Sequence, residues 1–168
     1  MITTRVETSA IYKCSLERAF KCPMLCDITK VHTGYFLSPR VTHCTNDETW
    51  GKVGGSRRTF FAATAFSKEG GTALDTVLDR IENKYWKIEV SDLKFPTMGI
   101  KKFQGEWYTT ANDNGTITVR YVYTLFTEST LLYPFHWFVT KVLWRIYMNH
   151  VLENVRKMAE GNEPFVQD

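Results

Sequence analysis

Residues 131–161 read LLYPFHWFVTKVLWRIYMNHVLENVRKMAEG, and this stretch determines how the rest of the chain is interpreted. Pro134 suits the first turn of a helix, and Gly161 suits the position just after its end. We expect one helix from Leu131 to Glu160, roughly 43 Å long at 1.5 Å per residue. Beyond Asn149 its pattern is amphipathic, which is typical of a helix packed on a sheet.

The first half of this helix is apolar almost all round, and three interpretations compete for it. Lys141 and Arg145, four residues apart on one stripe, are its only certain charges. The remaining faces can bury against a sheet and loops. A transmembrane span is disfavoured because two basic residues would each cost several kcal/mol inside a bilayer. Docking of residues 131–148 on a membrane surface or a partner protein is the third interpretation.

Upstream, polar and apolar residues alternate with the period of β-strands. Residues 4–13 form the first predicted strand, and residues 16–31 form two short helices, with Ser15 as an N-cap and Pro23 in the first turn of the second. Strands follow from Val41 onward, separated by turn residues at 46–47, 54–55, 82–84 and 112–115. The order predicts the α+β class, with a curved antiparallel sheet of about six to seven strands around the closing helix in one domain, residues 1–168.

Composition narrows the classes of function. The chain has 43% hydrophobic and 23% charged residues, as ordinary globular proteins do, and its net charge of +3 comes from interspersed signs. No basic patch for nucleic acid is indicated. Aromatic residues reach 14%, which fits either a ring-rich core or an apolar cavity lined by rings. The N-terminal residues lack an apolar signal segment, so we expect a cytoplasmic protein.

Four cysteines raise the question of metal binding. Cys22 and Cys26 lie four residues apart, with His32, His43 and Cys44 further along the chain. Structural zinc sites usually pair cysteines at closer spacing, so this pattern favours reduced thiols. We expect neither a metal ion nor another cofactor.

Three segments carry a resemblance to a known family. They are VETSAIYKCSLERAF at 6–20, VGGSRRTF at 53–60 and LENVRKMAEG at 152–161. With the order of elements, they make nearly the whole chain similar to the START-like or helix-grip (SRPBCC) superfamily, which includes polyketide cyclase-like proteins, the birch pollen allergen family and plant hormone receptors. Relatives commonly place a Trp after the two short helices, where this chain has Tyr35 and Phe36.

The resemblance implies a ligand cavity between the sheet and the long helix. Predicted ligand contacts are Arg58, Trp86, Ile88, Phe103, Trp107, Tyr121, Tyr123, Phe138 and Val142, and each apolar one is equally compatible with plain core packing. Because Arg57 and Arg58 alternate along a strand, one of them should face inward, and we favour Arg58. In an enzyme, Glu106 or Asp92 would act as a base if burial raised its pKa.

Three functions follow as hypotheses. The first is binding or carrying of an apolar small molecule, such as a lipid, isoprenoid or polyketide-like compound. The second is a metal-independent cyclase, dehydratase or lyase acting on such a molecule. The third is a membrane- or protein-interaction module that uses the apolar helix start. No hydrolase, metalloprotease, P-loop or dinucleotide-binding motif is present in the sequence. The oligomeric state is open.

Overall fold

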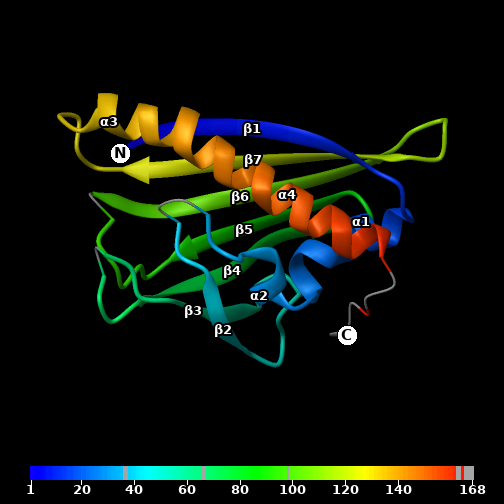
Figure 1. The fold of residues 1–168 in the computed structure, drawn as a ribbon, viewed down its shortest axis with the longest axis horizontal. Coiled ribbons are helices and arrows are strands. Elements are labelled where there is room, and N and C mark those ends of the chain that lie inside the picture. Colours follow the sequence, from blue (N-terminus) through cyan, green and yellow to red (C-terminus); the bar gives the residue numbers. More distant parts are fainter. Residues whose placement is uncertain (36–37, 66, 98, 162–163, 165–168) are drawn as a thin grey trace.

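A computed structural model of the chain describes residues 1–35, 38–65, 67–97, 99–161 and 164 (Figure 1). The elements in chain order are β1 (Ile2–Tyr12), α1 (Leu16–Leu25), α2 (Ile28–Val31), β2 (Val41–Asn46), β3 (Ser56–Phe61), β4 (Gly71–Ile81), β5 (Tyr85–Ser91), β6 (Ile100–Ala111), β7 (Ile117–Thr127), α3 (Tyr133–Phe138), η1 (Val139–Trp144) and α4 (Arg145–Glu160). The predicted α+β class, the first strand and the two short helices after it are confirmed.

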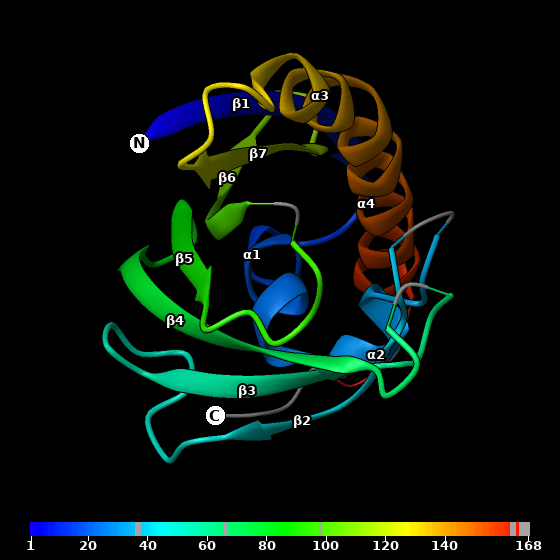
Figure 2. The ribbon, with the colours of Figure 1, turned by 90° about the vertical axis from the view of Figure 1, so that its left-hand side faces the viewer.

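The strands form one antiparallel sheet in the order β1-β7-β6-β5-β4-β3-β2. Consecutive strands pair as hairpins, except that β1 pairs with β7, so the first strand lies beside the last. The sheet curves around the long C-terminal helix, which lies across its concave face (Figure 2). We call this concave side the inner face.

The predicted turns lie where their residue types suggested. Between β6 and β7, Gly115 has a φ of +78° and its amide donates to the carbonyl of Asn112 at 3.0 Å. Between β4 and β5, Asn83 has a φ of +57°, a conformation that asparagine tolerates better than most residues. The Asp47 carboxylate closes the long β2–β3 loop by accepting from the Ser56 amide at 2.7 Å.

The closing helix begins at Tyr133, two residues later than expected, and its middle is π-helical. The Thr140 hydroxyl donates to the carbonyl of His136 at 2.7 Å. In an α-helix the amide of residue 140 would take that carbonyl, so the side chain competes with the α-helical ladder here. We attribute the π-turn of η1 to this competition.

Helix α1 caps one end of the sheet and anchors the C-terminal end of α4. Ser15 accepts from the Arg18 amide at 3.2 Å and confirms the predicted N-cap. The Arg18 guanidinium donates to the carbonyls of Met158 and Ala159, both at 2.7 Å, and places a positive charge where the helix dipole is negative. No helix within the described residues is long and apolar enough to cross a bilayer.

Pro23 lies inside α1, so its predicted place in the first turn of the second helix is wrong. Proline has no amide hydrogen, and the carbonyl four residues earlier, that of Ala19, therefore loses its helical donor. The buried indole of Trp107 donates to this carbonyl at 3.1 Å. The indole of Trp86 likewise donates to the backbone carbonyl of Phe20, at 2.8 Å. The two indoles thus attach α1 to the inner face.

We expect Trp107→Phe to lower the free energy of unfolding by about 1–3 kcal/mol, because the carbonyl of Ala19 would be buried without a donor. Adding Pro23→Ala restores a backbone donor and should recover part of this loss in urea denaturation. Trp86→Phe is the matched control, since its acceptor pairs with residue 24 in an α-helical pattern. Equal rescue of both tryptophan variants by Pro23→Ala would contradict this explanation.

Candidate functional site

Aromatic side chains gather where the sheet faces η1 and the start of α4. Phe103 of β6 and Tyr121 and Tyr123 of β7 lie on the inner face, as predicted. Trp144 of η1 stacks on Phe103 with ring centroids 5.0 Å apart, and lies 5.4 Å from Tyr123. Tyr147 of α4 lies 5.3 Å from Trp144. We call these five side chains the aromatic cluster.

The aromatic cluster keeps accessible surface although helix and sheet cover it. Phe103, Tyr121, Tyr123, Tyr147 and the adjacent Ile88 retain 5–8% of their surface, and Trp144 is half-buried. Other inner-face residues, Val77, Trp86 and Leu125, retain 1% or less. Space at least as large as a water molecule therefore adjoins the cluster, whereas these three neighbours are fully packed.

Gly105 lets the Tyr123 ring extend across the sheet. It pairs with Tyr123 on one side and with Ile88 on the other. A Cβ atom at Gly105 would lie 3.1 Å from Cε2 of Tyr123 and 3.3 Å from Cγ1 of Ile88, tighter than normal packing allows. The missing side chain thus leaves room for the phenol to lie over β6 and reach toward the centre of the inner face.

Trp86 and Trp107 also lie on the inner face, but in the closed core beneath α1. Their indole N–H groups are already engaged by backbone carbonyls. We therefore assign them to the attachment of α1 and leave them out of the ligand contacts proposed below.

The prediction that Phe138 and Val142 face the interior is wrong. They are 48% and 38% exposed on the outer side of the helix. The inward stripe recurs every four residues and consists of His136, Thr140, Trp144 and Met148. Because this half of the helix is apolar all round, the pattern of hydrophobic residues does not show which stripe is buried. The buried stripe in fact contains two polar residues, His136 and Thr140.

The prediction that Arg58 faces inward is also wrong, because Arg57 does. Arg57 is 4% exposed, and its Nε donates to Oδ2 of Asp75 at 2.8 Å. Arg58 points outward to Asp92, at the same distance. Thr59 donates to Oδ2 of Asp75 at 2.9 Å, so the buried carboxylate has two donors. Paired in this way, the two buried charges compensate each other.

Asp75 was missed by sequence reasoning, although a signal was available. It stands between Ala73 and Val77 on the buried face of β4. An acidic residue in step with apolar ones predicts a buried carboxylate, and a buried carboxylate needs a cationic partner. The β3–β4 register places Arg57 directly opposite.

His32 and Tyr147 form a second polar pair at the edge of the aromatic cluster. His32, the C-cap of α2, hydrogen-bonds the Tyr147 hydroxyl through Nδ1. Burial, with a smaller contribution from the Arg57 charge, lowers the pKa of His32 to about 3. Burial raises the pKa of Tyr147. Both side chains are therefore neutral at pH 7.

The phenols on β7 are neutral for the same reason. Burial raises the pKa of Tyr121 and Tyr123, and their neighbour Asp75 adds to the effect. The Tyr121 and Tyr123 rings meet edge to face, with centroids 5.4 Å apart. The interior thus presents neutral hydroxyl groups beside one compensated ion pair.

Neither carboxylate predicted as a base suits that role. Glu106 points to the outer face, where it accepts from the Tyr85 and Tyr108 hydroxyls, both at 2.9 Å. Despite some desolvation, those hydrogen bonds lower its pKa. Hydrogen bonds from Lys94 and Arg58 lower the pKa of exposed Asp92. The net pKa of each carboxyl is lowered rather than raised, so the condition under which either would act as a base is not met.

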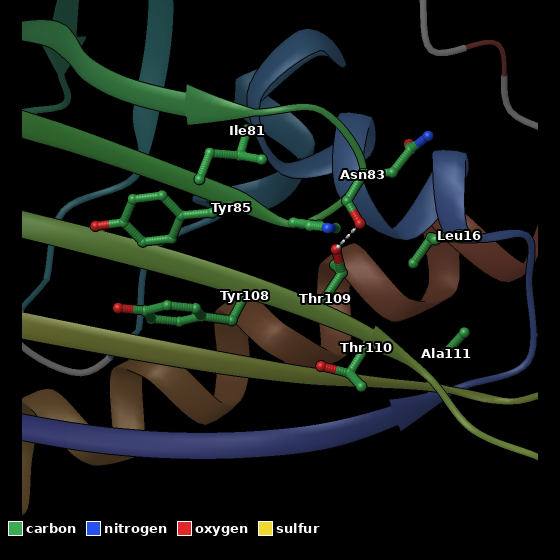
Figure 3. Close-up of a pocket in the computed structure, with 9 residues that line it drawn as sticks. Leu16, Ile81, Asn83, Tyr85, Tyr108, Thr109, Thr110 and Ala111 are labelled. Atoms are coloured by element: carbon green, nitrogen blue, oxygen red, sulfur yellow. Dashed lines mark hydrogen bonds between the residues drawn. The ribbon is translucent and has the colours of Figure 1, made fainter.

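Two surface hollows lie away from the aromatic cluster. An open groove of about 670 Å³ runs over the end of the sheet beside α1 (Figure 3). It is lined by Leu16, Ile81, Asn83, Lys84, Tyr85, Tyr108, Thr109, Thr110 and Ala111. A hollow of about 340 Å³ lies between α2 and β2, and is lined by Met24, Leu25, Cys26, Asp27, Ile28, Cys44, Asn46, Trp50, Arg57 and Pro164. Neither includes a side chain of the aromatic cluster.

The cysteines are free thiols in the structure. Burial raises the pKa of Cys22 to about 11 and that of Cys26 to about 12, so both are protonated and weakly nucleophilic near neutral pH. Within the described residues, no three His, Cys, Asp or Glu side chains come together as metal ligands would. Tyr35 stacks on His150 of α4 at 4.9 Å, and Phe36 lies outside the described residues.

Comparison with solved structures matches this architecture over almost its whole length. Ara h 8.0201 superposes with a TM-score of 0.66 at 12% identity, over 94% of this chain and 97% of that one. A structural-genomics protein from Nitrosospira multiformis gives 0.63 at 14% identity, over 93% and 96%. In comparisons of sequence, no protein-family model and no curated protein matches the chain.

The chain has the helix-grip fold. Ara h 8.0201 is a Bet v 1-like protein, so the helix-grip fold here is of the Bet v 1 or START-like kind. At these identities the likeness concerns the fold alone. In the helix-grip fold the helix and the inner face enclose the interior, which is where the aromatic cluster lies.

Proposed function

We propose that the protein binds an apolar small molecule between the inner face and the η1–α4 helix. The observation that supports the proposal is the aromatic cluster, whose residues keep some accessible surface although the helix packs on them. Trp144 supports it, because its Nε1 is buried and donates to no described residue. A buried donor without an acceptor costs stability, and an oxygen atom of a ligand would satisfy it.

The charge balance of the interior narrows the ligand class. The Arg57 guanidinium is compensated by Asp75, and Tyr123 and Tyr147 are neutral. Among the described residues of the inner face, a ligand carboxylate would meet no uncompensated cation, which is unfavourable in a dry interior. We therefore favour an uncharged molecule with a hydroxyl or carbonyl group, such as an isoprenoid, a polyketide-like compound or a fatty alcohol, over a fatty acid.

We propose that the ligand enters beside three half-buried apolar side chains at the end of β5 and the start of β6. Val90 at the end of β5, Leu93 and Ile100 at the start of β6 are half-buried and pack against the core, as Trp144 does. Figure 2 views the molecule from this end, where the chain after β5 passes in front of the inner face toward the helix. A ligand entering here would meet Phe103 and Trp144 first.

We expect Trp144→Phe to weaken binding of the uncharged fluorescent probe Nile red about fivefold or more, the loss of roughly one hydrogen bond. The matched control is Trp137→Phe, which makes the same change on the outer side of the same helix. Fluorescence titration of both variants measures the difference. Equal loss in the two variants, or in neither, would contradict binding at the aromatic cluster.

The second candidate function, after ligand binding, is that of a cyclase or dehydratase. The His32–Tyr147 pair is the feature that favours it, because a histidine bonded to a phenol is a common acid–base arrangement. However, efficient proton transfer needs a pKa near the working pH, whereas the pKa of His32 is about 3 and that of Tyr147 is raised. If the protein converts a ligand extracted from it, and His32→Gln abolishes the conversion, the cyclase or dehydratase function would be favoured over binding alone.

A further inference from the structure

The outer side of the closing helix gathers exposed apolar side chains. Among the described residues, fourteen large hydrophobic side chains are exposed, and eight of them lie between residues 131 and 146. We call these eight the outer helix face: Leu131, Leu132, Tyr133, Phe135, Trp137, Phe138, Val142 and Ile146. Leu131, at the tip, is 88% exposed. Large apolar side chains gathered on one exposed segment usually mark an interaction site.

Spacing divides the helical part of this face into two stripes. Phe138, Val142 and Ile146 follow one another at intervals of four residues, as do Trp137, Lys141 and Arg145 on the adjacent stripe. Residues four apart lie on one side of a helix. An aliphatic and aromatic stripe thus runs beside a stripe of one indole and two cations.

The charge on this surface has one sign. No Asp or Glu occurs between Glu128 and Glu153. Lys141 donates to the backbone carbonyl of Arg5, which leaves its charge uncompensated, and Arg145 is exposed. Neither cation forms an ion pair with an acidic side chain of the described residues. The partner of this face should therefore be apolar beneath and anionic around its rim.

We propose that the outer helix face docks on the surface of an anionic lipid bilayer. Tryptophan and tyrosine favour the membrane–water interface, and lysine and arginine beside an apolar stripe bind anionic headgroups. A second copy of the chain fits less well, because a symmetric contact would bring two copies of Lys141 and Arg145 into one interface that contains no acidic residue from this face. The proposal does not depend on the ligand.

The test is co-flotation of the full chain with vesicles of phosphatidylcholine alone or mixed with phosphatidylserine. We expect flotation with the mixed vesicles only, and its loss in Trp137→Ser/Phe138→Ser. The matched control is Val53→Ser/Ile81→Ser, which removes apolar side chains that are somewhat more exposed from other parts of the surface. Arg145→Glu should weaken binding at least about fivefold, whereas Lys52→Glu, in the β2–β3 loop, should change it little.

Three outcomes would overturn the proposal. One is a protein that stays in the aqueous fraction with both kinds of vesicle. Another is flotation that Trp137→Ser/Phe138→Ser and the control reduce equally. The third is a dimer in light scattering that Phe138→Ser dissociates, which would assign the face to self-association. Nile red titration of Trp137→Ser/Phe138→Ser separates the two proposals, because interior binding should be unchanged.

Discussion

Arg57→Ala is expected to lower the free energy of unfolding by about 3–5 kcal/mol, because it leaves the Asp75 carboxylate buried without its cation. The Thr59 hydroxyl alone cannot compensate a buried charge. Urea denaturation at pH 7 measures the change. A loss of this size would be a large part of the stability of an ordinary domain, so the variant should also show a clearly lower melting temperature.

The neighbouring arginine supplies the control. Arg58→Ala removes an ion pair of the same length, 2.8 Å, but both partners are about one-third exposed. Solvent-exposed pairs contribute little, so this variant should lose less than about 1 kcal/mol. Similar losses for the two variants would show that the burial of Arg57 does not make the difference that the structure indicates.

The second large expected effect is that the free energy of unfolding depends on pH, because His32 binds a proton more readily in the unfolded chain than in the folded protein. In the unfolded chain His32 binds a proton below its ordinary pKa of 6.5, but in the folded protein only near 3. The unfolded state therefore holds more protons between these values, and stability falls as the pH is lowered through this window. The contribution is at most about 1.4 kcal/mol per pH unit.

We expect His32→Gln to flatten this dependence between pH 6.5 and about pH 5, where carboxylates contribute little because most are still ionised. Urea midpoints across that range measure the slope, and comparing slopes separates protonation from the loss of the Tyr147 contact. The exposed His43, changed to Gln, is the control and should keep the wild-type slope. A His32→Gln slope equal to that of the wild type would contradict a histidine whose pKa is lowered in the folded protein.

The sheet and its connections could be predicted because strand alternation and turn residues are visible in short stretches of sequence. Strand alternation marked β1 and β4 to β7, and the residues at 82–84 and 112–115 marked two tight turns. The long helix was predicted from its apolar length and from Gly161. The buried stripe of its first half was predicted wrongly, because a segment that is apolar all round does not show which side faces the core. The π-turn around Thr140, which we attribute to one side-chain hydrogen bond, has no signal in the pattern of apolar residues.

The candidate site was only partly predictable because its members meet through the tertiary fold. Alternation showed that one of Arg57 and Arg58 faces inward. Which of the two does so depends on the register between β3 and β4, which places Arg57 opposite Asp75. Phe103, Tyr121 and Tyr123 were predicted through the resemblance to the helix-grip family, and strand periodicity supported the two tyrosines. His32 and Tyr147 are 115 residues apart in sequence, and nothing local indicates that they touch.

Native mass spectrometry of freshly purified protein, followed by solvent extraction, tests most directly whether a small molecule occupies the interior. We expect a species heavier than the 19.5 kDa chain by one apolar, uncharged molecule, which added fatty alcohol displaces and which Trp144→Phe retains less well. A bare chain that takes up neither fatty alcohols, fatty acids nor aromatic polyketides would contradict the proposed function.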